Sequence, residues 1–248
     1  MKNIIALLLS LLLFAVVING CSSSKETGIT EKPKEVVKEI VKPVVIKNVE
    51  LEERRLTKSE KIKTIDKIQF DFNSRGKPSN GRKTSQLKYN PEGFSSESLF
   101  YDRNGRIDSR YEYKYNEKGY RIETVRYNSA GKPDKRYTYE YNKYGNKIKA
   151  TRFNISGKME KYYLYEYDEY GNLVNDLWYN FDGTLEYKIV NKYDEDGNKI
   201  ESDGYTPDGN LSEKVEYQYD KKGNVIEEIR YNQDGNKNGL VQYVYRYY

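Results

Sequence analysis

The sequence Tyr167-Asp168-Glu169-Tyr170-Gly171-Asn172-Leu173-Val174 contains a motif that recurs along the chain and indicates how it folds. An aromatic residue is followed by Asn or Asp, then by two variable residues, then by Gly. Asn or Asp suits the first position of a type I turn, and a glycine three residues later accepts a positive φ. A type I turn followed by a left-handed glycine commonly connects two antiparallel strands. Each copy of this pentad therefore predicts the bend of a β-hairpin.

The pentad recurs with strict spacing along most of the chain. Two series, each with a period of 26 residues, alternate at spacings of 12 and 14 residues. Glycine ends all twelve copies, and Asn or Asp follows the aromatic residue in eleven, with Thr206 as the exception. A fixed period of this length indicates a repeat architecture. The glycines predicted to lie in the bends are Gly93, Gly105, Gly119, Gly131, Gly145, Gly157, Gly171, Gly183, Gly197, Gly209, Gly223 and Gly235.

The segments between the bends alternate in polarity. Tyr111, Tyr113 and Tyr115 share one side of a segment, while Glu112 and Lys114 take the other. This period of two predicts strands with one polar face. The shorter segments alternate less cleanly before the next aromatic residue, which predicts a β-bulge there. Because no helical segment separates the bends, neighbouring strands should pair. The predicted fold is all-β: an antiparallel meander of tandem 26-residue β-hairpins that forms one twisted or curled sheet.

The 27 tyrosines argue for a folded body despite a mean hydropathy of -0.98. Their columns form either the core of the curled sheet or an aromatic face that binds sugar rings or a protein. If they form the core, contacts with a ligand fall to residues outside the columns: Tyr144, Tyr162, Tyr170 and Trp178. The column of Trp178 also holds Phe, Arg and Gly in other repeats, and we predict that it faces solvent.

The N-terminus has the features of an export signal. Lys2 precedes an apolar run over residues 4–18, which is shorter than the roughly 20 residues that span a membrane. Ile18-Asn19-Gly20-Cys21 resembles the lipobox of bacterial lipoproteins, although Asn19 departs from the usual pattern. The resemblance implies that Cys21 carries lipid and becomes the mature N-terminus. The following residues, 22–24, are serines and lack the aspartate associated with inner-membrane retention, which favours the outer membrane.

Three regions follow from these patterns. Residues 1–20 are predicted to be a lipoprotein signal peptide. Residues 21–64 are rich in Lys, Glu and Pro, have no aromatic residue, and are predicted to be a flexible tether. A short helix over residues 49–62 is the alternative there. Residues 65–248 are predicted to form the repeat domain.

The pentads resemble the YD repeats of RHS-type proteins. Tyr167-Asp168-Glu169-Tyr170-Gly171-Asn172-Leu173-Val174 and Tyr219-Asp220-Lys221-Lys222-Gly223-Asn224-Val225-Ile226 match that pattern best, and the resemblance spans about residues 89–248. It implies a β-hairpin repeat and says little about function. The chain has a weaker likeness to MORN-type repeats, including small antitoxin-like proteins, whose repeats are shorter and have different glycine spacing.

Composition argues against several functions. The chain has no histidine and its one cysteine is Cys21, so we predict no catalytic residues, no metal site, no cofactor and no enzymatic activity. No Lys/Arg run dominates the net charge of +5, so we predict no nucleic-acid partner.

We therefore expect a lipid-anchored protein of the cell envelope that acts as a binding or structural repeat module. Its partners would be the membrane, through the lipid on Cys21, and a glycan or protein ligand. The alternative is an immunity or antitoxin-like protein that binds a cognate toxin, either through a free strand edge at residues 244–248 or through the concave face of the sheet. The sequence leaves the oligomeric state and the ligand-binding residues open.

Overall fold

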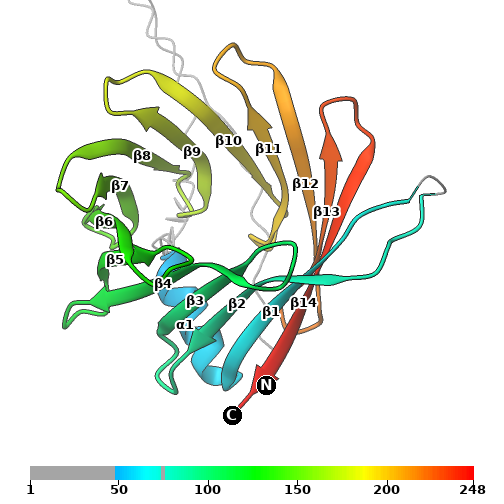
Figure 1. The fold of residues 1–248 in the computed structure, drawn as a ribbon, viewed down its shortest axis with the longest axis horizontal. Coiled ribbons are helices and arrows are strands. Elements are labelled where there is room, and N and C mark those ends of the chain that lie inside the picture. The colour runs from blue at the N-terminus through cyan, green and yellow to red at the C-terminus, as the bar shows by residue number, and fades with distance from the viewer. Residues whose placement is uncertain (1–47, 74–75) are drawn as a thin grey trace, which may run out of the picture. The chain divides into compact units, whose positions relative to one another are not determined.

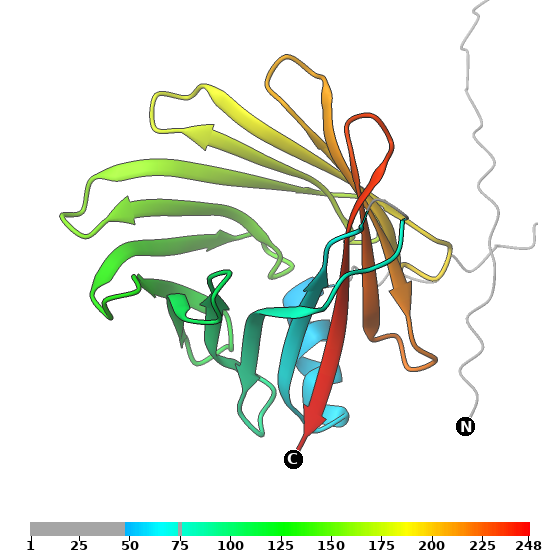
Figure 2. The same ribbon diagram turned by 45° about the vertical axis from the view of Figure 1, so that its right-hand side comes forward.

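The computed structural model describes residues 48–73 and 76–248, so the predicted signal peptide, Cys21 and the tether up to residue 47 lie outside the described residues. Within these residues the chain forms one helix, α1 (Val49–Ser59), and fourteen strands (Figures 1 and 2). The strands are β1 (Ile62–Phe70), β2 (Arg82–Tyr89), β3 (Ser95–Tyr101), β4 (Ile107–Tyr115), β5 (Arg121–Tyr127), β6 (Pro133–Tyr141), β7 (Lys147–Asn154), β8 (Met159–Tyr167), β9 (Leu173–Asn180), β10 (Leu185–Tyr193), β11 (Lys199–Tyr205), β12 (Leu211–Tyr219), β13 (Val225–Asn232) and β14 (Lys237–Tyr247).

The bend between β6 and β7 shows how the pentad makes a turn. The backbone N–H of Gly145 donates to the carbonyl of Asn142 at 2.9 Å. The side-chain oxygen of Asn142 accepts from the backbone N–H groups of Tyr144 and Asn146, each at 3.0 Å. Gly145 has a φ of 83°, a left-handed conformation that strains residues with a Cβ. All twelve pentad glycines lie in bends between strands, with φ between 73° and 88°.

Each strand pairs antiparallel with the strand that follows it in the sequence, so the predicted meander is confirmed. The predicted bulges are confirmed as well, because the register shifts before the aromatic residue of the shorter strands, as between Arg126 and Tyr127 and between Arg152 and Phe153. The sheet does more than twist or curl. β1 pairs with β14, with Ile65 opposite Tyr245, and the fourteen strands form a closed barrel. The sequence did not reveal this closure, because β1 precedes the regular pentads.

Closure overturns the prediction of a free strand edge at residues 244–248. β14 is paired with β13 on one side and with β1 on the other. The backbone N–H of Tyr248 also donates to the carbonyl of Lys61 at 2.8 Å. The C-terminal segment therefore has partners on both sides within the barrel.

The helix α1 corrects the predicted boundary between tether and repeat domain. Residues 49–64 are not a flexible tether, because they form α1 and the start of β1. The side chain of Asn48 caps the helix by accepting from the backbone N–H of Leu51 at 3.0 Å. The alternative of a short helix over residues 49–62 is close to the observed Val49–Ser59. The folded domain thus includes residues 48–64, which the prediction had assigned to the tether.

The helix crosses one mouth of the barrel from side to side (Figure 1). At its start, Asn48 Nδ2 donates to the carbonyl of Tyr144 in the β6–β7 bend at 3.2 Å. Just past its end, Glu60 pairs with Lys222 in the β12–β13 bend. These two bends lie on opposite sides of the closed strand order. Between them, the hydroxyl of Tyr89 donates to Glu53 at 3.2 Å.

The tyrosine columns face the inside of the barrel, which we call the lumen. Tyr245 and Tyr219 line the space beside α1, and most inward tyrosines remain partly exposed. Small polar side chains between the columns are nearly inaccessible, for example Ser98 at 3% and Thr124 at 3%. The lumen is therefore lined by aromatic and polar groups around cavities, and is not filled by a solid apolar core.

In the described part of the chain, no helix has the length and apolar character needed to cross a membrane. Across residues 48–73 and 76–248 there is also no group of three or more Cys, Asp or Glu side chains arranged to hold a metal ion.

Candidate functional site

The inner wall follows the repeat from β4 to β9 and then departs from it. In three successive hairpins a large inward residue pairs with another: Tyr111 with Arg126, Tyr137 with Arg152, and Tyr163 with Trp178. In the next hairpin the equivalent pair is Ile189 with Gly204, and in the one after it Val215 with Arg230. Small residues thus replace large ones on the wall from β10 to β12.

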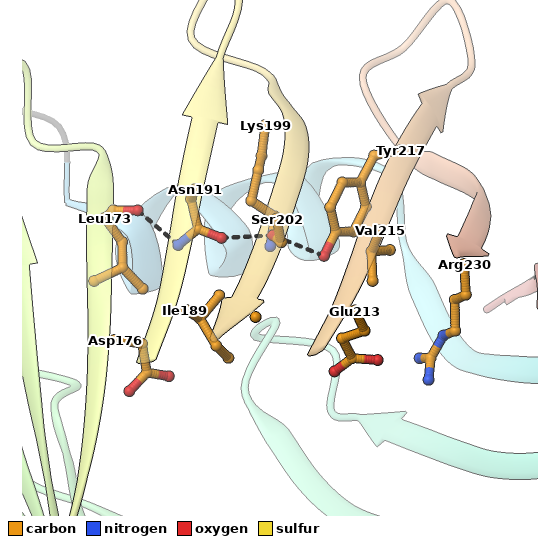
Figure 3. Close-up of a pocket in the computed structure, with 11 residues that line it drawn as sticks. Leu173, Asp176, Ile189, Asn191, Lys199, Ser202, Glu213, Val215, Tyr217 and Arg230 are labelled. Atoms are coloured by element: carbon orange, nitrogen blue, oxygen red, sulfur yellow. Dashed lines mark hydrogen bonds between the residues drawn. The ribbon is translucent and has the colours of Figure 1, made fainter. Parts of the chain in front are cut away.

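A cavity of about 240 Å³ occupies the space that these replacements leave (Figure 3). We call it the repeat-break cavity, and the residues that define it include Asp176, Ile189, Asn191, Gly204, Val215 and Arg230. Its volume lies below the roughly 300–1,000 Å³ of pockets for drug-sized ligands. The cavity therefore suits one small polar molecule or one unit of a longer polymer.

A chain of hydrogen bonds fixes the polar floor of the repeat-break cavity (Figure 3). Asn191 takes the place that tyrosine has in the preceding hairpins, and its Nδ2 donates to the carbonyl of Leu173 at 2.9 Å. The hydroxyl of Ser202 donates to Asn191 Oδ1 at 2.6 Å and lies 3.2 Å from the hydroxyl of Tyr217. Because each group is held by its neighbour, their orientations are set before any ligand arrives.

Aromatic rings lie beside Gly204, next to the residues that line the cavity. The hydroxyl of Tyr187 lies over this glycine, where an added Cβ would be only 2.0 Å from it, and reaches Glu213 at 3.3 Å. The ring of Tyr187 is 5.3 Å from that of Trp178, which in turn is 5.8 Å from that of Tyr163. Gly204 is thus required by close approach, and the three rings form a continuous aromatic wall.

Two charged side chains that line the cavity, Asp176 and Arg230, each have a polar atom without a hydrogen-bond partner among the described residues. Burial raises the pKa of Asp176 to about 6, against the opposing effect of the Trp178 indole N–H and nearby lysines. Burial opposes the charge of Arg230, but its ion pair with Glu228 at 3.0 Å raises its pKa. Among the described residues, Asp176 Oδ1, the adjacent Trp178 Nε1 and Arg230 Nε are buried without a hydrogen-bond partner, as are Arg126 Nε and Arg152 Nε in the column of Arg230. A buried acceptor and a buried donor that lack partners are costly unless a ligand or water completes them.

The contact candidates outside the tyrosine columns lie in three different places. Tyr144 and Tyr170 are exposed in bends, and Tyr162 stacks on Tyr179 with ring centres 5.0 Å apart. Trp178 was predicted to face solvent, and this is wrong, because it pairs with Tyr163 inside the barrel. Its column varies because it lines the lumen, where each replacement changes the shape of the wall.

The cavity residues do not form a recognisable site in the sequence. Their signal was nevertheless present, since Ile189 and Asn191 interrupt the tyrosine series and Gly204 stands where other repeats have Phe, Arg or Trp. What the sequence could not show was that these positions, on different strands, face one another across a closed lumen.

Comparison with known proteins gives no family. No protein-family model matches the chain, and no curated protein matches it. Among solved structures, a porin-like protein from Bacteroides uniformis is 12% identical, with 75% of this chain covering 98% of that chain at a TM-score of 0.44. A DUF1329 family protein from Desulfovibrio piger is 13% identical, with 78% of this chain covering 89% of that chain at a TM-score of 0.34. The Tc holotoxin pore of Photorhabdus luminescens is 14% identical over 73% of this chain, which spans 11% of that chain, at a TM-score of 0.30. These are distant likenesses of β-rich structures and say nothing about a ligand.

Proposed function

We propose that this chain is a non-enzymatic lipoprotein of the cell envelope whose barrel binds a saccharide in the repeat-break cavity. The observation that carries the proposal is the local loss of large side chains between β10 and β12, which opens a polar hollow beside an aromatic wall. A lipid on Cys21 would hold the barrel at the membrane, with the outer membrane as the expected location.

The chemistry of the cavity matches that of a sugar ring. The C–H faces of a sugar pack against aromatic rings, and Trp178 and Tyr187 present such rings beside the cavity. Sugar hydroxyls both donate and accept hydrogen bonds. Asp176 Oδ1 offers an acceptor, and Arg230 Nε and the indole N–H of Trp178 offer donors; all three are buried without a partner among the described residues.

The outer face of the barrel supports a water-exposed position for the domain. Its charged side chains pair across neighbouring strands, as Lys114 does with Glu123 at 2.6 Å and Lys149 with Glu140 at 3.1 Å. Charged side chains of this kind are found where a protein meets water.

A substitution that restores the repeat tests the proposal. Val215→Tyr recreates the Tyr–Arg pair of the earlier hairpins and fills the cavity. We expect the full chain carrying Cys21→Ala to bind a member of a panel of peptidoglycan fragments and oligosaccharides in calorimetry, and the added Val215→Tyr to abolish that binding. Val125→Tyr, on the outer face of β5, is the matched control and should bind like the parent. Equal binding by the two tyrosine variants would contradict the proposed site.

The anchor needs a separate experiment. Cells that express the wild-type chain should incorporate radiolabelled fatty acid into it, and the Cys21→Ala chain should not. Equal labelling of both chains would remove the lipoprotein part of the proposal.

A further inference from the structure

A second, larger cavity lies between α1 and the barrel wall, and we propose that it binds the alkyl chain of a fatty acid whose carboxylate meets Lys199. This site goes beyond the saccharide site, because it lies on the helix side of the lumen and has a different lining. We call it the helix-side cavity, defined by Leu56, Ile65, Leu87, Val225, Tyr219 and Tyr245.

The lining of the helix-side cavity suits a long apolar group. Its volume is about 680 Å³, within the range of ligand pockets. Leu56 of α1 faces aliphatic side chains from both ends of the meander, Ile65 of β1 and Val225 of β13. The tyrosines fix their own polar ends elsewhere, since the hydroxyl of Tyr245 donates to the carbonyl of Val225 and that of Tyr219 to the carbonyl of Lys199, each at 2.7 Å. Their rings are therefore free to present apolar surface to a ligand.

Positive charge gathers at the inner end of this cavity. Lys67 and Lys199 both line it, and Arg230 lies nearby on β13. Glu228, the acid beside Lys67, is already engaged: it pairs with Arg230 at 3.0 Å, lies 3.6 Å from Lys67, and accepts from the hydroxyl of Tyr243. This one carboxylate thus serves two cations.

Lys199 is a lining cation that no carboxylate contacts directly, although Asp176 on the side of the repeat-break cavity is close enough for the two charges to interact. Its ammonium sits over the ring of Tyr217 at 4.4 Å, and among the described residues it has no carboxylate within ion-pair distance. Lys199 lines both the helix-side cavity and the repeat-break cavity, and so stands where the two meet. A carboxylate there would complete the charge balance, with its alkyl chain directed toward α1.

Paired ligands test both parts of this assignment. The full chain carrying Cys21→Ala, which removes its own lipid, is titrated with laurate and with the uncharged dodecanol. Laurate should bind more tightly than dodecanol. Lys199→Gln should weaken laurate binding by about tenfold or more and leave dodecanol unchanged, as expected for loss of a charged hydrogen bond. Lys149→Gln, which removes a lysine of the outer face, should bind like the parent chain.

A separate variant tests the part of the cavity that would hold the alkyl chain of the ligand. Val225→Trp fills the helix-side cavity without touching the repeat-break cavity, and should abolish the binding of both amphiphiles while circular dichroism stays unchanged. Laurate and dodecanol binding with equal affinity to the parent chain would overturn the proposal, as would no binding of either. Saccharide titrations of Val225→Trp and laurate titrations of Val215→Tyr separate the two sites, because each variant should lose one ligand and keep the other.

Discussion

The wall from β4 to β9 and the wall from β10 to β13 are built from the same repeat but have different inner surfaces. The first holds Tyr–Arg and Tyr–Trp pairs at successive hairpins, and the second holds Ile–Gly and Val–Arg at the same places. Bends and strand pairing continue unchanged through both. In this barrel the regular positions make the scaffold, and the departures from regularity make the cavity.

Removing a large inward side chain from the wall of β4 to β9, which we call the regular wall, should have the largest effect on stability. Tyr165 lies in the lumen beneath Lys147, at 4.9 Å, and burial raises its pKa. Tyr165→Asn copies the residue found one repeat later at Asn191, without the Ser202 and Tyr217 partners that hold that amide. We expect a loss of about 3 kcal/mol in the free energy of unfolding, measured by denaturant titration. Tyr162→Asn on the outer face should lower the free energy of unfolding by about 1 kcal/mol. An equal loss for both variants would contradict a larger contribution of the inward tyrosines to stability.

Restoring the tyrosines of the repeat at the repeat-break cavity should have a similarly large effect on the free energy of saccharide binding. The double variant Ile189→Tyr/Val215→Tyr gives both hairpins the tyrosine of their predecessors. We expect saccharide affinity to fall by more than about a hundredfold, or roughly 2.7 kcal/mol, because the cavity is filled. Calorimetry at high protein concentration measures the change. Retained affinity would place the ligand elsewhere in the molecule.

The contribution of Asp176, in the repeat-break cavity, to the stability of the fold should depend on pH. The pKa of Asp176 is raised to about 6 in the folded chain, while its counterpart one repeat earlier is Ala150. A raised carboxyl pKa means that the ionised form destabilises the fold above pH 6, and that this cost disappears as pH falls through 6 to about 4. Asp176→Asn should therefore add about 2 kcal/mol of stability at pH 7.5 and little at pH 4. A gain that does not depend on pH would show that ionisation of Asp176 is not its cause.

Substitutions in the bends should have the smallest effects on stability, and these effects should be equal on the two walls. Gly157 and Gly209 have φ values of 85° and 84°, and an added Cβ at either would meet nothing within 4 Å. Gly157→Ala and Gly209→Ala should each cost about 1 kcal/mol from backbone strain alone. Thermal unfolding of both variants checks this, and a difference above about 1 kcal/mol would mean that the scaffold itself differs between the walls.

The sequence alone revealed the repeat unit but not its closure. The spacing of twelve glycines predicted the bends, the meander and even the bulges before Tyr127 and Phe153, because turn chemistry and strand alternation are local properties. Closure depends on the pairing of β1 with β14, which are separated by most of the chain and share no motif. The helix was predicted only as the alternative to a tether, because it lies in a charged segment without aromatic residues, and the cap at Asn48 supports it. The cavity needed closure to be recognised, because Ile189, Gly204 and Val215 look like weak repeat positions until their strands enclose a lumen.

Chemical-shift mapping locates the saccharide on the barrel wall. The saccharide identified by titration is added to the ¹⁵N-labelled chain carrying Cys21→Ala, and backbone amide shifts are followed. We expect the largest changes at Asn191, Ser202 and Gly204, with little change at Thr124 and Ala150 in the regular wall. Shifts centred on the regular wall or on the outer face would contradict the claim that the broken repeat forms the binding site.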